Sequence, residues 1–216
     1  MEVKINLKIF AFAVLFFITG QLEIYGILML FACIHELGHL LFGILLGFKP
    51  KSIHIMPLGL CINFYVFPKD YNQKIMNSNR LKVKKIIIAA AGPVTNFFFA
   101  IFFSLYPINI LGIVPQTIIY ANLLIGIFNL IPIYPLDGGR IIKNIFSLLC
   151  GYKRALIFTN KLSNITMILL TMISSILICY YKNIAILLII IYLWILVVFQ
   201  NRKYQMKMNL YQMLEK

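Results

Sequence analysis

Long apolar runs separated by short polar connections dominate the pattern of this 216-residue chain. Six such runs can be followed from one end to the other. They occupy residues 5–19, 22–48, 86–111, 113–133, 162–181 and 184–199. Most of them approach or exceed the ~20 residues that an α-helix needs to cross a bilayer. The pattern therefore predicts an all-α membrane protein with six transmembrane helices.

The basic residues lie almost entirely in alternate connections. The N-terminus, the connections 49–85 and 134–161, and the segment after residue 199 hold all of the 20 Lys and Arg except Lys182. Cytoplasmic loops carry such an excess of basic residues. Six spans place these segments on one side, so we predict a multi-pass protein of the cell membrane with both termini in the cytoplasm.

The first apolar run has a competing interpretation as a signal peptide, because Lys4 and Lys8 precede the uninterrupted apolar stretch that begins at Ile9. Cleavage after Gly20 would need a small residue at position 18, but that position holds the bulky Ile18. We therefore expect a retained first helix.

The long connection after the second run contains two β-leaning stretches, residues 52–56 and 60–67, around Pro57-Leu58-Gly59. They predict a short β-hairpin. The stretch is too apolar for a solvated loop, so we expect a re-entrant or interfacial position; an irregular amphipathic loop remains the alternative. Residues 77–85 are polar and basic and are expected to face solvent or lipid headgroups.

Composition narrows the class of protein further. Hydrophobic residues make up 62% of the chain and charged residues 12%, with a mean hydropathy of +0.92. The net charge of +14 is dispersed over short connections, which argues against nucleic acid as a partner. We expect one polytopic membrane domain over residues 1–200 and a short basic cytoplasmic tail over residues 201–216.

Candidate chemistry begins with His35-Glu36-Leu37-Gly38-His39 inside the second apolar run. The i, i+4 spacing places both imidazoles on one face of a helix, where they can bind a metal. Glu36 then lies where it can act as general base on a metal-activated water. The alternative is a histidine pair bonded to backbone carbonyls beside a protonated Glu36, although such groups are costly to bury in lipid.

A catalytic zinc site uses three protein ligands and leaves one position open, so a third ligand is expected. Few residues can supply it. Apart from Glu36, the remaining acids and histidine are Glu2, Glu23, His54, Asp70, Asp137 and Glu215. Asp137 is the best candidate, because it closes a segment in which prolines and glycines interrupt any regular helix. Such a break is tolerated at membrane depth where it faces protein or a water-filled cavity. An ordinary helix-ending turn with a capping aspartate is the competing interpretation.

Two asparagines lie in apolar runs, Asn96 and Asn129. Each is suited to bridging helices, and each could equally donate a hydrogen bond to a polarised peptide carbonyl or its oxyanion.

The motifs His35-Glu36-Leu37-Gly38-His39 and Leu136-Asp137-Gly138 resemble those of the site-2 protease family of intramembrane zinc metalloproteases, peptidase family M50. The stretch 91–96 is similar to the family's Gly-Pro-containing helix. The resemblance covers about residues 31–140 and is greatest to the stage IV sporulation protein FB branch, whose member matures a sigma factor. Neither a PDZ insertion nor a CBS domain is evident in the sequence.

The resemblance implies a zinc metalloendopeptidase with Zn²⁺ held by His35, His39 and Asp137 and with Glu36 as base. It also implies a substrate-facing loop, and we expect the substrate-binding residues to be Asn96, Asn129, Pro132 and Pro135. The substrate would be a membrane-associated protein, in the sporulation branch a pro-sigma factor cut in the membrane around the forespore.

Two other functions are compatible with the same residues. A divalent-metal transporter would use intramembrane His and acidic residues as a transit site. A non-catalytic scaffold would hold a membrane partner. The pattern leaves room for membrane inhibitors or regulatory proteins as partners, and it does not indicate an oligomeric state.

Overall fold

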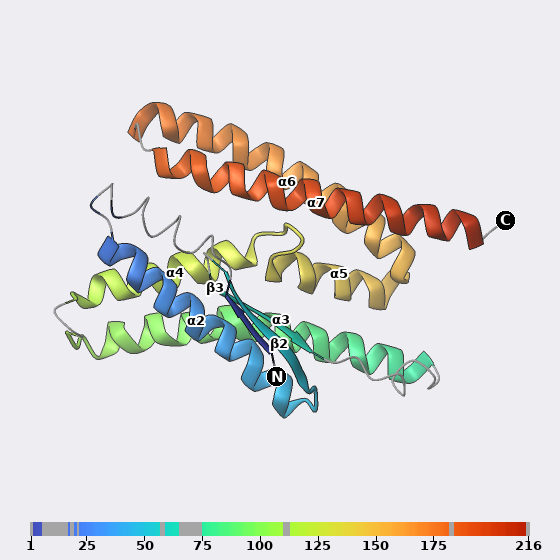
Figure 1. Cartoon of the computed structure of the whole chain (residues 1–216), viewed down its shortest axis with the longest axis horizontal. Helices are drawn as coiled ribbons and strands as arrows, with labels where there is room; N and C mark the ends of the chain where they lie inside the picture. The colour runs from blue at the N-terminus through green and yellow to red at the C-terminus, as the bar shows by residue number, and fades with distance from the viewer. Residues whose placement is uncertain are drawn as a thin grey trace. The chain divides into compact units, whose positions relative to one another are not determined.

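The computed structural model describes residues 2–5, 17, 20, 22–56, 59–64, 75–109, 113–181 and 184–214. Within these residues the chain forms six helices and three strands (Figure 1). The helices are α2 (Leu22–Leu45), α3 (Ile75–Leu105), α4 (Pro115–Leu130), α5 (Asp137–Cys150), α6 (Tyr152–Tyr181) and α7 (Ile184–Leu214), and the strands are β1 (Glu2–Ile5), β2 (Pro50–Met56) and β3 (Gly59–Phe64). The chain divides into two compact units, Met1–Leu130 and Ile131–Lys216, which are described separately.

Three of the described helices are long and apolar enough to cross a membrane. They cover Glu23–Leu45, Asn79–Leu105 and Tyr152–Tyr180. Only 17–39% of their most apolar windows is buried inside the protein, which leaves wide apolar faces for lipid. The predicted helical membrane architecture is therefore confirmed, while the number of six spans stays a prediction.

The boundaries differ from the expected ones in several places. α3 begins at Ile75, so the polar stretch 77–85 is helical. α4 has 16 residues and is shorter than the run from which it was predicted. α5 lies inside a segment expected to be a connection, and α7 continues to Leu214 through the segment expected to be a tail. Most of the first expected span lies outside the described residues, and its first residue, Ile5, ends β1.

The first unit has its core where α2, α3 and α4 meet. Ile27, Phe31, Phe103, Ile118 and Ala121 form a buried hydrophobic cluster. The Phe31 ring packs edge-on against Phe103, with 6.4 Å between the ring centroids. This packing holds α2 against the two helices that follow it.

The C-terminus of α2 is closed by hydrogen bonds of the Schellman type. Phe48 N–H donates to the carbonyl of Gly43 and Gly47 N–H to that of Ile44, with Gly47 at φ +86°. Lys84 of α3 adds a hydrogen bond from Nζ to the Leu46 carbonyl at 2.9 Å. The chain then turns directly into β2.

The predicted β-hairpin is confirmed. β2 and β3 pair antiparallel, with Ile53 opposite Ile62 and His54 opposite Cys61. β1 adds a third, parallel strand on the other side of β2, which the sequence pattern did not indicate. Residues 65–67, which were expected to extend the second strand, lie outside the described residues.

In the second unit, α6 and α7 run side by side, and α5 packs against α6 (Figure 1). Asn201 of α7 donates to Asn164 of α6 at 3.2 Å. Phe146 of α5 stacks on Phe158 of α6 with 3.9 Å between ring centroids. These contacts fix α5, whose first residue is Asp137, to the α6–α7 pair.

Candidate metal centre

Two histidines one turn apart on α2 form the centre of the first unit's candidate site. His35 and His39 are 2% and 4% exposed. Their Nε2 atoms lie 3.2 Å apart, and the rings are nearly perpendicular at 88°. The i, i+4 spacing that the sequence shows therefore places both imidazoles at one buried point, as predicted.

A single face of α3 lies against the two imidazoles. Ile88, Gly92 and Asn96 follow one another at intervals of four residues and so share one side of that helix. Asn96 contacts His35, and Ile88 contacts His39. The earlier histidine of α2 thus contacts the later residue of α3, and the later histidine contacts the earlier residue. The two helices therefore run antiparallel here.

The contacts to α3 fix the tautomers of both rings. His39 Nδ1 is 2.6 Å from the Ile88 carbonyl, and His35 Nδ1 is 3.0 Å from Asn96 Oδ1. Because both oxygens are acceptors, both Nδ1 atoms carry the proton and donate. Each Nε2 then directs a lone pair into the same small space. The 3.2 Å contact between the two Nε2 atoms brings both nitrogens within reach of a single cation.

Glycines make the close approach of the two helices possible. A Cβ on Gly92 would lie 2.5 Å from Nε2 of both His35 and His39. A Cβ on Gly38 would collide with Thr95 Oγ1 and lie 3.2 Å from the Ala91 carbonyl. Small residues at such a seam let helix backbones approach each other within a membrane. The space that the missing Cβ of Gly92 leaves open lies directly over the two Nε2 atoms.

In the second unit, Asp137 is the first residue of α5 and is 4% exposed. Its Oδ1 accepts a hydrogen bond from Arg140 Nη1 at 3.4 Å. A carboxylate at a helix N-terminus is also stabilised by the helix dipole. The preceding loop contains the cis peptide bond Tyr134–Pro135, and Gly139 packs against that loop where a Cβ would collide with Tyr134 N. The contacts of Arg140 and Gly139 fix the position of Asp137 at the start of α5.

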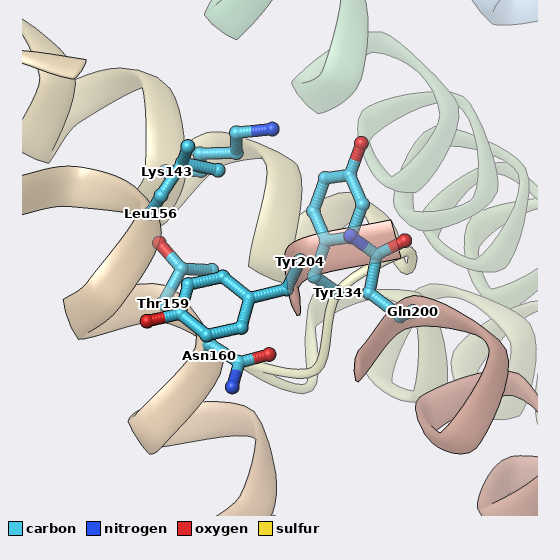
Figure 2. Close-up of a pocket in the computed structure, with 7 residues that line it drawn as sticks. All are labelled: Tyr134, Lys143, Leu156, Thr159, Asn160, Gln200 and Tyr204. Carbon is cyan, nitrogen blue, oxygen red and sulfur yellow. The ribbon is translucent and has the colours of Figure 1, made fainter. Parts of the chain in front are cut away.

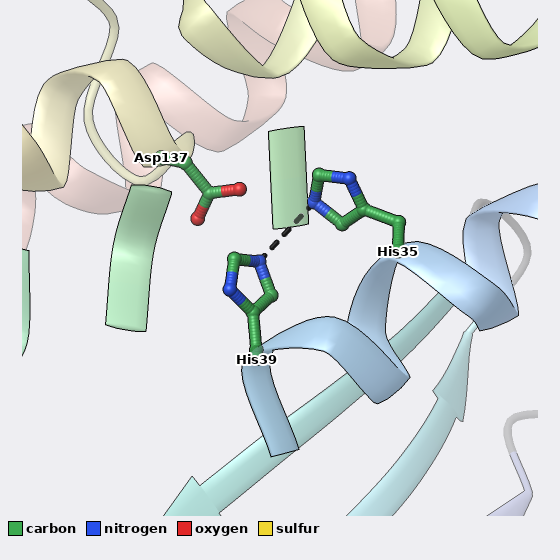
Figure 3. A group of neighbouring side chains, drawn as sticks. All are labelled: His35, His39 and Asp137. Carbon is green, nitrogen blue, oxygen red and sulfur yellow. Dashed lines mark hydrogen bonds between the residues drawn. The ribbon is translucent and has the colours of Figure 1, made fainter. Parts of the chain in front are cut away.

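The candidate metal-binding group consists of His35 and His39 of the first unit and Asp137 of the second, and each of these residues is buried (Figure 3). Two imidazole nitrogens and one carboxylate oxygen are the donor set of many catalytic zinc sites. The residues therefore fit zinc in donor type and tautomer, and Gly92 leaves the space that an ion needs.

The other residues singled out in the sequence have varied surroundings. Glu36 is partly buried and follows His35 directly on α2. Asn129 uses its Nδ2 to bond the Ile125 carbonyl of its own helix at 3.0 Å. Pro132 and Pro135 lie in the loop before α5 and are partly buried. Nothing in these surroundings tests a role in substrate binding.

Sequence reasoning missed two contributions. The carbonyl of Ile88 has no sequence signature, because every residue has a backbone carbonyl. Ser163 of α6 accepts a hydrogen bond from Tyr134 N–H in the loop before Asp137. A polar residue within an apolar run was the signal that could have found it.

Comparison with known proteins decides the family. The sequence model of peptidase family M50 matches residues 24–113 and 107–173, which together are more than half of the chain. The chain belongs to peptidase family M50. The match includes both motifs that carry the candidate metal-binding group.

Relatives of this M50 chain are recognisable at low identity. A zinc metalloprotease of Methanocaldococcus jannaschii is 32% identical over 127 residues, 56% of this chain and 34% of the relative. The stage IV sporulation protein FB of Bacillus subtilis is 23% identical over 159 residues, 72% of this chain and 51% of the relative. The chain thus matches about half or less of the length of these relatives.

The fold is also similar to that of a solved structure. The site-2 protease from Methanocaldococcus jannaschii superposes with a TM-score of 0.65 and 25% sequence identity. The match covers 90% of this chain and 88% of that structure. The membrane fold expected from the resemblance is therefore confirmed at the level of the family.

Proposed function

We propose that this M50 chain is an intramembrane zinc metalloprotease that hydrolyses a peptide bond of a membrane-associated protein. The observation that carries the proposal is the buried imidazole pair. Both Nδ1 atoms are bound by α3, and the two Nε2 atoms lie 3.2 Å apart, on the helix that also carries Glu36. With each Nδ1 bound to α3, the two Nε2 atoms are the nitrogens that remain close enough together to bind one ion.

Each residue has a distinct part in the proposed reaction. His35, His39 and Asp137 hold the ion. A bound zinc supplies Lewis-acid activation of water and of the scissile carbonyl. Glu36, next to the first ligand on α2, takes the proton of the attacking water and returns it to the departing amine nitrogen. Arg140 offsets the charge of Asp137 before the ion binds.

Replacement of Glu36 gives the direct test. Glu36→Gln removes the base but no ligand, so zinc content should stay at the wild-type level while cleavage falls at least ~100-fold. The assay uses the purified full-length protein with membrane-associated candidate substrates and follows the new terminus by mass spectrometry. A zinc chelator should abolish cleavage by the wild-type protein. Undiminished cleavage by Glu36→Gln would remove Glu36 from the mechanism, and metal flux in proteoliposomes without cleavage would favour a transporter.

Asn96 has two roles in this proposal. Its Oδ1 holds His35, and its Nδ2 has no hydrogen-bond partner among the described residues although the side chain is 0% exposed. A buried unpaired donor is costly, and a substrate carbonyl would satisfy it. Asn129, Pro132 and Pro135 complete the proposed substrate-binding set, in the segment that leads to Asp137.

Two substitutions separate the roles of Asn96. Asn96→Asp keeps an acceptor for His35 but loses the donor, so zinc should stay bound while kcat falls about 100-fold. Asn96→Ala loses both groups and should also weaken zinc binding about 10-fold. Equal zinc affinities and equal kcat values for the two variants would contradict the assignment.

We further propose that the substrate is a pro-sigma factor processed during sporulation, in the membrane around the forespore. The similarity to stage IV sporulation protein FB over 72% of this chain supports this closer assignment. Co-expression with candidate pro-sigma factors, with Glu36→Gln as control, tests it. If the chain cleaves another membrane protein but leaves the pro-sigma factors unprocessed, the proposal of proteolysis stands and the pro-sigma assignment is wrong.

A further inference from the structure

Ser163 lies within α6 and is 3% exposed. Its hydroxyl donates to the Thr159 carbonyl of its own helix at 2.8 Å. With its proton committed there, the oxygen keeps lone pairs for a donor. Tyr134 N–H provides that donor at 3.0 Å. Ser163 therefore joins α6 to the loop that precedes Asp137.

Two other backbone donors of this loop are used within it. Ile133 N–H donates to the Ile131 carbonyl at 2.7 Å, and Leu136 N–H donates to the Ile133 carbonyl at 2.8 Å. The two prolines of the loop have no N–H. Tyr134 N–H is thus the donor that ties the loop to a neighbouring helix, and Ser163 is its acceptor.

The loop transmits its position directly to Asp137. Tyr134 precedes Asp137 by three residues, and Gly139 packs on the loop backbone with no room for a Cβ between them. The Tyr134 ring is held as well, because Lys143 Nζ lies 4.5 Å from its centroid. Figure 2 shows Tyr134 and Lys143 among the residues that line a small pocket in this unit. A displaced Tyr134 would therefore displace the first turn of α5.

We propose that Ser163 is a positioning residue for the metal ligand Asp137. The inference rests on the proposed function, since it takes Asp137 as a zinc ligand. Groups that orient a ligand change metal affinity without touching the ion. The competing role for Ser163 is purely local, because many helix hydroxyls bond only the carbonyl one turn earlier.

Ser174 provides a matched control for that local role. It lies on the same helix, is 6% exposed, and donates to the Thr171 carbonyl at 3.1 Å. Ser174→Ala therefore removes a buried helix hydroxyl of the same kind at a point away from the loop. Ser163→Cys is a second probe, nearly equal in size to serine but a weak acceptor.

The experiment measures zinc affinity of the purified full-length protein in detergent by competition with a chromophoric chelator. Ser163→Ala should bind zinc about 10-fold more weakly than wild type, Ser163→Cys should fall between them, and Ser174→Ala should match wild type. The visible absorption of bound Co²⁺ should change for Ser163→Ala and not for Ser174→Ala. The midpoint temperature of thermal unfolding, measured without metal, should fall by similar amounts in the two Ser→Ala variants.

Three results would overturn the inference. Wild-type zinc affinity and Co²⁺ absorption in Ser163→Ala would show that the hydroxyl does not position Asp137. Equal weakening in Ser163→Ala and Ser174→Ala would assign the effect to general loss of stability. If Ser163→Ala does not fold, wild-type affinity in Ser163→Cys would likewise show that Asp137 does not depend on this hydroxyl. A wild-type protein that binds no zinc would instead refute the proposed function as well.

Discussion

At the residue scale, the candidate metal centre depends on which nitrogen of each histidine carries the proton. The Ile88 carbonyl and Asn96 Oδ1 place both protons on Nδ1. The two Nε2 atoms then become ligands without any rearrangement of the rings. Folding therefore orients both imidazole rings before an ion binds, so ion binding does not have to supply the free energy of ordering them.

Gly92 allows a test at this scale. Gly92→Ala puts a methyl group 2.5 Å from both Nε2 atoms, so the rings or α3 must move. We expect zinc affinity to fall more than about 10-fold and overpacking to cost ~1–3 kcal/mol of stability. Isothermal titration with Zn²⁺ and thermal unfolding measure the two effects.

The matched control for this test is Gly26→Ala on α2, where a Cβ would meet nothing within 4 Å. It should leave zinc affinity unchanged, because the added methyl group disturbs no neighbour. It should not destabilise α2 either, because alanine suits a helix better than glycine does. Normal zinc binding by Gly92→Ala would mean that the space above the imidazoles is not where the ion binds.

At the scale of the elements, the sequence predicted what periodicity and length can show. The run that became α2, the hairpin of β2 and β3, and the helical break before Asp137 each had a clear local signal. Hydropathy could not locate the start of α3, because a helix that continues past the apolar core looks like a polar connection. β1 was missed because parallel pairing with β2 depends on a distant segment.

The hairpin register supplies a prediction at this scale. His54 lies opposite Cys61, a pairing that suits a disulfide across two strands. In a background without the other three cysteines, His54→Cys should form an intramolecular disulfide with Cys61 under mild oxidation. A mobility shift that reverses on reduction, checked by peptide mass, detects it.

Ile55→Cys is the corresponding control, because Ile55 lies opposite Leu60 and successive positions of a strand alternate between the two faces of a sheet. It should remain reduced under the same conditions. Efficient crosslinking of Ile55→Cys in preference to His54→Cys would mean that the strands pair in a register shifted by one residue.

At the scale of the whole molecule, the sequence predicted a membrane protein of M50 type, and the family match bears this out. The number of membrane crossings was harder to predict from the sequence. α4 is 16 residues long and apolar, whereas α5 is a separate helix in a segment expected to be a connection. Basic residues predict sidedness independently of helix length, so topology can be tested without counting spans.

Accessibility of single cysteines gives that test. Among variants that keep only one cysteine, Lys182→Cys should react with a membrane-impermeant maleimide in intact cells. Cys150, which is exposed at the end of α5, should react only after permeabilisation. Labelling of both positions from the same side would contradict six spans with both termini in the cytoplasm.

The contact between His39 and Ile88 has one more consequence, for how this centre would be mapped by experiment. Its acceptor belongs to the main chain, so any side chain at position 88 can present the same oxygen. An alanine scan would register Asn96 and pass over Ile88, although both orient an imidazole. Replacing the amide between residues 88 and 89 by an ester weakens that oxygen as an acceptor. This change would reveal the contribution of the Ile88 carbonyl to orienting His39, which side-chain substitutions do not detect.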